Sequence, residues 1–372
     1  MPTAPLLTTR ALNRATLDRQ LLLRPAALTA EQAVHHLVGL QAQNTKPPYY
    51  ALAARLDGFT PDDLSALMAS RKVGRLASLR STVHTHTAAD AVSLRRLVQH
   101  GALDRELSMF RKGLTGVDLD QLTALTADLV AEAPQPPKAL RERLLQTWPD
   151  ADPLALTIAA RCLLPMVQAT PRGLWGRSGQ VALTSAVRWF GYADDAPEAM
   201  AADLDATVLR YLAAFGPASV KDMQSWCGLT RLKAAFERLR PQLLVFRDEH
   251  DTELFDLPDA PRPAEDTPAP PRLLPEFDNL LLSHADRTRV VSAEHRARTW
   301  TVNQSHRVFL VDGFVAGLWW LDEAKDRTTV TLEPFGRLTR AQRTELTAEA
   351  DRTLRLLGRP GLPYDIGFRA TD

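Results

Sequence analysis

One stretch decides the expected fold: residues 219–257 are SVKDMQSWCGLTRLKAAFERLRPQLLVFRDEHDTELFDL. Ser219 can cap the free amides at a helix start, and Gly228 suits the end of that helix. A second helix is predicted to begin at Thr230, and two apolar runs separated by a polar turn predict a hairpin over residues 243–257. Two helices joined by a short turn with glycine are typical of a helix-turn-helix, and the hairpin would make this unit a winged helix.

The same order of elements is predicted twice more, upstream of this stretch. Helices beginning after Thr29 and at Pro61 lead to Arg80–His86, which alternates with the period of a strand. Helical patterns near 120–132, 137–147 and 153–163 then precede strand patterns at 166–169 and 181–184. The sequence therefore predicts an α+β fold with three tandem winged-helix units.

The C-terminal third has a different composition. Residues 258–271 hold six prolines, which predicts a semi-rigid extended spacer. Strand patterns at 308–312 and 314–320 flank an Asp-Gly turn, a helix is expected from about Arg340 to Leu357, and Trp319 and Trp320 are expected in the core. The predicted domains are winged helices over 1–100, 101–200 and 201–258, a Pro-rich linker over 259–272, and a C-terminal β-rich domain with a closing helix over 273–372.

The charge is balanced over the whole chain but not along it. The 45 basic residues against 44 acidic ones give a net charge of +1. Residues 1–100 contain 12 basic and six acidic side chains, so they carry +6. This asymmetry hints at an anionic ligand near the N-terminal part, although a solvated face would have the same composition. Arginine outnumbers lysine 38 to 7, which suits phosphate binding or simply reflects a GC-rich genome.

Several protein classes can be excluded. Cys162 and Cys227 cannot form a disulfide framework. No N-terminal signal and no apolar run of membrane-spanning length is present, so a cytoplasmic protein is expected, associated with the nucleoid if it binds DNA. No phosphate-binding loop, dinucleotide fingerprint or nucleophile elbow occurs. His84 and His86 share one side of a strand but lack a nearby third ligand, so neither a metal nor another cofactor is expected.

Two glutamines, Gln41 and Gln43, lie where the helix after Thr29 should end. Residues i and i+2 point to the same side only where the backbone is extended. Taken alone, the pair is equally compatible with a polar helix terminus.

The run Val38–Gln43, followed by Pro48–Leu56, closely resembles the tandem winged-helix DNA glycosylases of the AlkZ-like family of bacteria. Further segments carry the same resemblance, which extends from about residue 8 to residue 360: Leu79–His84, Pro171–Gly176, Leu273–Asp278 and Leu310–Gly317. The resemblance implies a concave surface that binds double-stranded DNA, and a catalytic pair at Gln41 and Gln43. A sister branch has Gln-x-Asp, so Gln43 indicates the AlkZ-like branch. Members of that branch resemble self-resistance enzymes that excise N7-alkylguanine adducts left by a DNA-alkylating antibiotic.

The chemistry of glutamine agrees with this implied substrate. An amide never ionises, so it cannot act as a strong general base, but it can orient a water molecule and donate a hydrogen bond. That contribution suffices only for a leaving group that is already activated. N7-alkylguanine carries a positive charge, so its glycosidic bond breaks without protonation by the enzyme. The resemblance therefore implies a monofunctional glycosylase, and the chemistry of its uncharged pair predicts that the enzyme acts on cationic lesions.

DNA contacts are expected from residues near the glutamine pair, in the second predicted wing and after the proline-rich segment. An ion pair or a solvated surface position is the alternative for each charged member. The candidates are Lys46, Arg80, Thr82, His84, Arg172, Trp175, Arg177, Arg287 and Arg289.

Two other functions compete with the glycosylase hypothesis. A transcriptional regulator could use the third winged helix, although no heptad pattern or dimerisation helix is present, and a monomer is expected. A protein-interaction scaffold would lack the salt dependence of phosphate binding.

Overall fold

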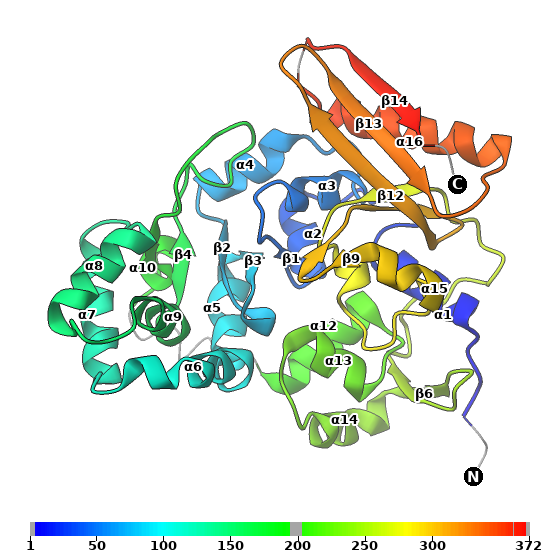
Figure 1. Cartoon of the computed structure of the whole chain (residues 1–372). Helices are drawn as coiled ribbons and strands as arrows, with labels where there is room; N and C mark the ends of the chain where they lie inside the picture. Colours follow the sequence, from blue (N-terminus) through cyan, green and yellow to red (C-terminus); the bar gives the residue numbers. More distant parts are fainter. Residues whose placement is uncertain (1–3, 194–202, 360, 370–372) are drawn as a thin grey trace.

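The computed structural model describes residues 4–193, 203–359 and 361–369 of the 372-residue chain. It confirms the predicted α+β class. Figure 1 shows a helical region around α7 (Leu119–Glu132) at one end and a C-terminal sheet at the other, with a smaller sheet between them. The predicted boundary between the second and third units, at residue 200, lies outside the described residues.

The central sheet joins strands from the first two hundred residues. Its order is β1-β3-β2-β4-β5, and Arg75 and Leu76 pair with Gln168 and Val167 to connect the two halves. The strands are β1 (Leu40–Gln41), β2 (Val73–Ala77), β3 (Val83–Thr87), β4 (Met166–Gln168) and β5 (Leu183–Ser185). Besides α7, the α-helices of the same described part of the chain are α1 (Thr9–Arg19), α2 (Ala30–His36), α3 (Pro47–Ala53), α4 (Pro61–Ala69), α5 (Ala88–Leu97), α6 (Asp104–Met109), α8 (Pro137–Thr147), α9 (Pro153–Leu163) and α10 (Ala186–Phe190).

The stretch that decided the expected fold has the predicted elements. The Ser219 side chain accepts from the backbone of Asp222, and Gly228 ends the helix with φ +80°. Apolar side chains from both helices and the hairpin form one buried cluster with α12. The elements are α12 (Leu204–Phe215), α13 (Val220–Cys227), α14 (Lys233–Leu239), β6 (Leu244–Arg247) and β7 (Glu253–Asp256).

A second five-stranded sheet follows, in the order β14-β13-β12-β11-β8, and only the β13–β14 pair is parallel. Trp319 is buried as predicted, but Trp320 is half-exposed because neighbouring residues of a strand face opposite sides. The strands are β8 (Arg272–Leu274), β11 (Val308–Val311), β12 (Phe314–Glu323), β13 (Thr328–Pro334) and β14 (Tyr364–Phe368), with a small hairpin of β9 (Trp300–Thr301) and β10 (Gln304–Ser305), the short helix α15 (Ala293–Arg296) and the long helix α16 (Arg340–Leu357).

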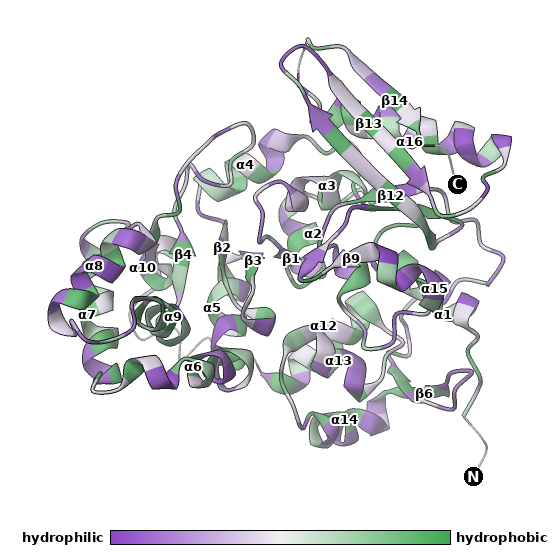
Figure 2. Ribbon diagram, in the orientation of Figure 1, coloured by the Kyte–Doolittle hydropathy of each residue, from purple (hydrophilic) through white to green (hydrophobic). Residues whose placement is uncertain are grey.

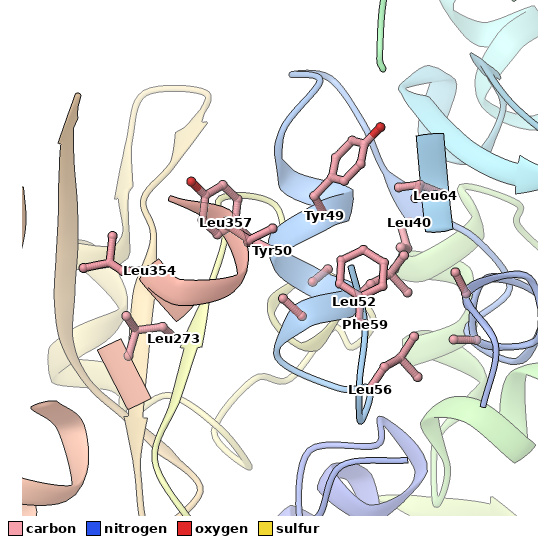
Figure 3. Close-up of a cluster of buried hydrophobic side chains, with 14 of the residues drawn as sticks. Leu40, Tyr49, Tyr50, Leu52, Leu56, Phe59, Leu64, Leu273, Leu354 and Leu357 are labelled. Carbon is pink, nitrogen blue, oxygen red and sulfur yellow. The ribbon is translucent and has the colours of Figure 1, made fainter. Parts of the chain in front are cut away.

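The C-terminal part and the N-terminal helices share one hydrophobic core. Tyr50 and Leu52 of α3 lie between Leu354 and Leu357 of α16 on one side and Leu40 on the other (Figure 3). Helix α16 alternates hydrophobic and hydrophilic residues along its length, as Figure 2 shows, because only one of its faces is buried. The two regions therefore hold the strand that carries Gln41 between them.

The proline-rich segment has no helix or strand before β8 begins, but it is not a free spacer. Arg14 of α1 donates to the carbonyl of Thr267 at 2.7 Å, and Arg19 donates to that of Pro261 at 3.1 Å. Within the described residues, no helix combines the length and apolar character needed to cross a lipid bilayer.

Candidate active site

A tight turn leads from α2 into β1. Val38 and Gly39 have φ of +54° and +96°, and the Gly39 amide donates to the carbonyl of Val34 at 2.9 Å. The chain then becomes extended: Gln41 lies opposite His84 of β3, and the Ala42 amide donates to Val83 at 2.7 Å. The strand ends at Gln41 and Gln43 follows in a bend, so only the first part of the Gln-x-Gln segment has the extended backbone.

The two glutamine side chains are held by the turn before β3 and by the first residue of that strand. Oε1 of Gln41 accepts from Nη2 of Arg80 at 2.7 Å, and Oε1 of Gln43 accepts from the backbone amide of Val83 at 3.3 Å. Gln41 is buried, whereas Gln43 is exposed. Each carbonyl oxygen keeps a second lone pair, so the exposed Gln43 can still accept from a water molecule.

Arg80 lies in a turn and not in the predicted strand. Residues Leu79–Ser81 form a short 3-10 helix in which Arg80 and Ser81 have φ of +53° and +59°. Left-handed residues cannot continue a β-ladder, so β3 starts only at Val83. Arg80 also donates to the carbonyl of Trp226 at the end of α13. Burial lowers the pKa of Arg80 to about 10, so its guanidinium remains charged at neutral pH.

His84 is a neutral acceptor behind Arg80. Its Nδ1 lies 3.0 Å from the carbonyl of Thr82, which can only accept, so Nδ1 carries the proton. Nε2 is then free to accept from Arg80 at 3.3 Å. Burial, followed by the charge of Arg80, lowers the pKa of His84 well below 6.5. The predicted DNA contact at His84 is therefore replaced by an internal role, because only 2% of the residue is exposed.

The second predicted wing packs beside the glutamine segment. Arg75 donates to the carbonyl of Ala42 at 2.7 Å, and the Tyr49 hydroxyl donates to that of Gly173 at 2.7 Å. The Trp175 ring lies 4.9 Å from that of Tyr49, with Lys46 at 5.8 Å from its centre. Trp175 therefore anchors the loop.

Three residues of the C-terminal part support the segment from behind. Asp278 accepts from both terminal nitrogens of the fully buried Arg55, at 2.7 and 2.9 Å. Asn279 donates to the carbonyl of Gly39 at 2.8 Å, and Glu276 accepts from Asn44 at 3.2 Å. The sequence singled out Leu273–Asp278 only as part of a resemblance, and nothing in its pattern indicated these contacts.

The remaining candidates for DNA contacts differ in their solvent exposure and in their partners. Arg177 is exposed, Thr82 is half-buried with its hydroxyl donating to Leu79, and Lys46 pairs with Glu323. Arg172 donates to the carbonyl of Gly179 at 3.0 Å, and Arg287 lies over the Trp300 ring at 5.8 Å.

The prediction for Arg289 requires correction. Its guanidinium is buried against the carbonyl of Pro217 at 2.8 Å and the carboxylate of Asp222 at 3.9 Å. Both partners are internal, so this arginine is not available to DNA.

Five hollows of the described surface, of about 360 to 890 Å³, are lined by residues other than Gln41 and Gln43. Among the described residues, no group of three or more His, Cys, Asp or Glu side chains could hold a metal ion.

Gly39→Ala should destabilise the protein strongly. A Cβ at Gly39 would lie 2.3 Å from Nδ1 of His86, and its φ of +96° is unfavourable for alanine. We expect a loss of roughly 3 kcal/mol in the free energy of unfolding, measured in urea. Gly58→Ala is the matched control, because φ is +65° there and no atom lies within 4 Å. It should cost only about 1 kcal/mol, and equal losses would contradict the proposed collision.

The free energy of unfolding should decrease as the pH is lowered from about 6.5 to about 4. Burial lowers the pKa of His86 to about 4 and that of His284 to about 3. The unfolded chain takes up these protons below its ordinary pKa of about 6.5, so it is stabilised first. The free energy of unfolding is therefore highest above pH 6.5. Below that pH it decreases by up to ~1.4 kcal/mol per pH unit for each histidine. Urea unfolding across this range should show a smaller slope for His86→Gln than for a variant of the exposed His250, and equal slopes would contradict the assignment.

The geometry is that of a surface site built from two amides, a cation and a neutral imidazole, with no metal-ligand set in the described part of the chain. A family model described as DNA glycosylase AlkZ-like matches residues 34–356, which is most of the chain. The chain therefore belongs to the AlkZ-like DNA glycosylase family, and it is an enzyme of DNA repair.

Among the similar solved structures is the DNA glycosylase AlkZ of Streptomyces sahachiroi. The two chains are 20% identical, with a TM-score of 0.76 over 97% of this chain and 99% of the other. At this identity the likeness concerns the fold. A comparison with curated protein sequences found no match.

Proposed function

We propose that this DNA glycosylase hydrolyses the N-glycosidic bond of cationic N7-alkylguanine in double-stranded DNA and leaves an abasic site. The observation that supports this most is the uncharged pair at the extended edge of the central sheet. Gln41 and Gln43 are amides, and their neighbours are a neutral histidine and a charged arginine. None of these groups can protonate a leaving base at neutral pH, so the base must be activated by its own charge.

In this mechanism the two glutamines have different tasks. The exposed Gln43 holds the attacking water through the free lone pair of Oε1. Arg80 occupies Oε1 of Gln41 at 2.7 Å, which turns the amide NH₂ of Gln41 toward the substrate as a donor. As the bond breaks, positive charge develops on the sugar, as for other glycosidic bonds, and nearby DNA phosphates stabilise it.

We infer that DNA lies across a concave surface formed by winged-helix units over 1–100, 101–200 and 201–258 and by the C-terminal domain. Arg177, which is exposed, and Arg287, which is half-buried, are the cations that we assign to the DNA phosphates, with Thr82, Lys46, Arg172 and Trp175 as further contacts. Arg80 contributes its charge from within the site, where it binds Gln41. Because Gln43 is exposed, we infer that a bulky adduct is approached on an open surface and not drawn into a pocket. Self-resistance to a DNA-alkylating antibiotic, action as a monomer and a location in the cytoplasm at the nucleoid complete the proposal.

The test uses duplex DNA with a single N7-methylguanine. The protein is added, abasic sites are cleaved with alkali, and strand breaks are counted. The proposal predicts a break at the lesion. A sequence-specific shift of undamaged DNA with no abasic product would instead favour a transcriptional regulator.

A further inference from the structure

Two side chains outside the glutamine segment contact the turn that carries Arg80. Glu106 lies on α6 and Arg161 on α9, and their side chains pair at 2.5 Å. The Ser81 hydroxyl donates to Glu106, and Nη1 of Arg161 donates to the backbone carbonyl of Ser81 at 3.1 Å. The pair therefore contacts both the side chain and the backbone of one residue in the turn.

This turn needs external support. Arg80 and Ser81 are consecutive non-glycine residues with positive φ, a conformation that costs each of them conformational free energy. Its own hydrogen bonds are short-range, from Ser81 to Ser78 and from Thr82 to Leu79. Such a backbone persists only where surrounding contacts determine it. Here α6 and α9 bind Ser81, and the end of α13 binds Arg80.

The conformation of the turn matters because it directs Arg80. From this backbone the guanidinium spans from Oε1 of Gln41, at 2.7 Å, to the carbonyl of Trp226 at the end of α13. A different φ at residues 80 and 81 would aim the side chain elsewhere and would release Gln41. Among the described residues, Glu106 and Arg161 form no hydrogen bond or ion pair with either glutamine, so they would act only through the turn.

We propose that Glu106 and Arg161 are positioning residues, which hold the turn at residues 79–82 so that Arg80 orients Gln41 for base excision. This proposal rests on the glycosylase function proposed above. It also assigns a role in the reaction to the second predicted unit: its helices set the geometry of a catalytic residue in the first.

The experiment measures single-turnover release of N7-methylguanine from duplex DNA, together with the Kd for the same duplex carrying a tetrahydrofuran abasic analogue. Glu106→Ala should slow release by about tenfold or more, because small misplacements of reacting groups have large effects on rate. Its Kd should stay within about twofold of the wild type. Glu106→Gln keeps an acceptor for Ser81 and should recover most of the rate. Ser81→Ala removes the same hydrogen bond by deleting its donor. It replaces Glu106→Ala in the experiment if that variant does not fold.

A double-mutant comparison separates positioning from a general structural effect. In the Arg80→Ala background there is no guanidinium to aim, so adding Glu106→Ala should slow release no further. If the double variant is slower than the wild type by the product of the two single-variant factors, the proposal is wrong. It is also wrong if Glu106→Ala and Ser81→Ala both release the base at the wild-type rate. The matched control is Glu142→Ala on α8, an exposed glutamate paired with Lys138, which should change nothing.

The outcomes for the two proposals are distinct. If the wild type is active and the effects of Glu106→Ala and Arg80→Ala multiply in the double variant, the positioning role is wrong and the glycosylase function is unaffected. A wild type that releases no N7-methylguanine removes both.

Discussion

Gln41→Ala and Gln43→Ala are each expected to reduce base release from N7-methylguanine DNA by roughly a hundredfold or more, the scale of a well-placed catalytic group. Gln43 would lose the acceptor that holds the water, and Gln41 would lose the donor that Arg80 orients. Gln43 is exposed, so Gln43→Ala should leave the urea midpoint nearly unchanged. Gln41 is buried and accepts from Arg80, so Gln41→Ala should lower the midpoint modestly. Single-turnover rates on the same duplex measure the effect.

The control for the glutamines is Gln146→Ala, which removes an exposed glutamine from α8. It should keep the full rate. Activity that survives both Gln41→Ala and Gln43→Ala would contradict the assignment of the catalytic pair, whatever the effect of the control.

Asp278→Ala is expected to cost about 3 to 5 kcal/mol of unfolding free energy, because it leaves the Arg55 guanidinium buried without its counter-charge. Both side chains of this pair are fully shielded from solvent. The change should also loosen the support behind Gly39, since Asn279 is the next residue. Urea unfolding monitored by tryptophan fluorescence measures the loss.

An exposed ion pair provides the comparison. Arg327 and Asp365 lie 2.8 Å apart with side chains 53% and 61% exposed, so Asp365→Ala should cost under about 1 kcal/mol. Similar losses for Asp278→Ala and Asp365→Ala would show that burial does not set the value of the Arg55 pair.

Local signals predicted the helices and hairpins well because their causes are local. The cap at Ser219, the helix end at Gly228 and the prolines at the starts of α4 and α9 act within a few residues. The joining of β2 to β4 could not be predicted in this way. It pairs residues 91 to 93 positions apart, and short strands carry no signal for a partner at that distance.

The positive charge of the N-terminal part is a poor predictor of a DNA-binding surface. Residues 1–100 carry +6, but much of that charge is internal. Five of their ten arginines are buried, and these bind carboxylates or backbone carbonyls: Arg14, Arg19, Arg55, Arg75 and Arg95. The excess therefore measures structural arginines as much as a surface for phosphates.

The glutamine pair was expected from a resemblance, whereas its environment was not. Ser81, which has a positive φ, contacts Glu106 and Arg161, and these residues lie 25 and 80 positions away in the chain. The contact of Asn279 with Gly39 likewise depends on how the C-terminal part docks. Such contacts follow from tertiary packing, and no periodicity in the sequence encodes them.

The most direct test of the central claim compares a cationic lesion with an uncharged one. One duplex carries N7-methylguanine and a second, of identical sequence, carries hypoxanthine; both are incubated with excess enzyme, and abasic sites are cleaved with alkali. A site without a general acid should release the cationic base at least ~100-fold faster, because an uncharged base then leaves without the protonation it needs. Comparable rates on the two duplexes would contradict the account.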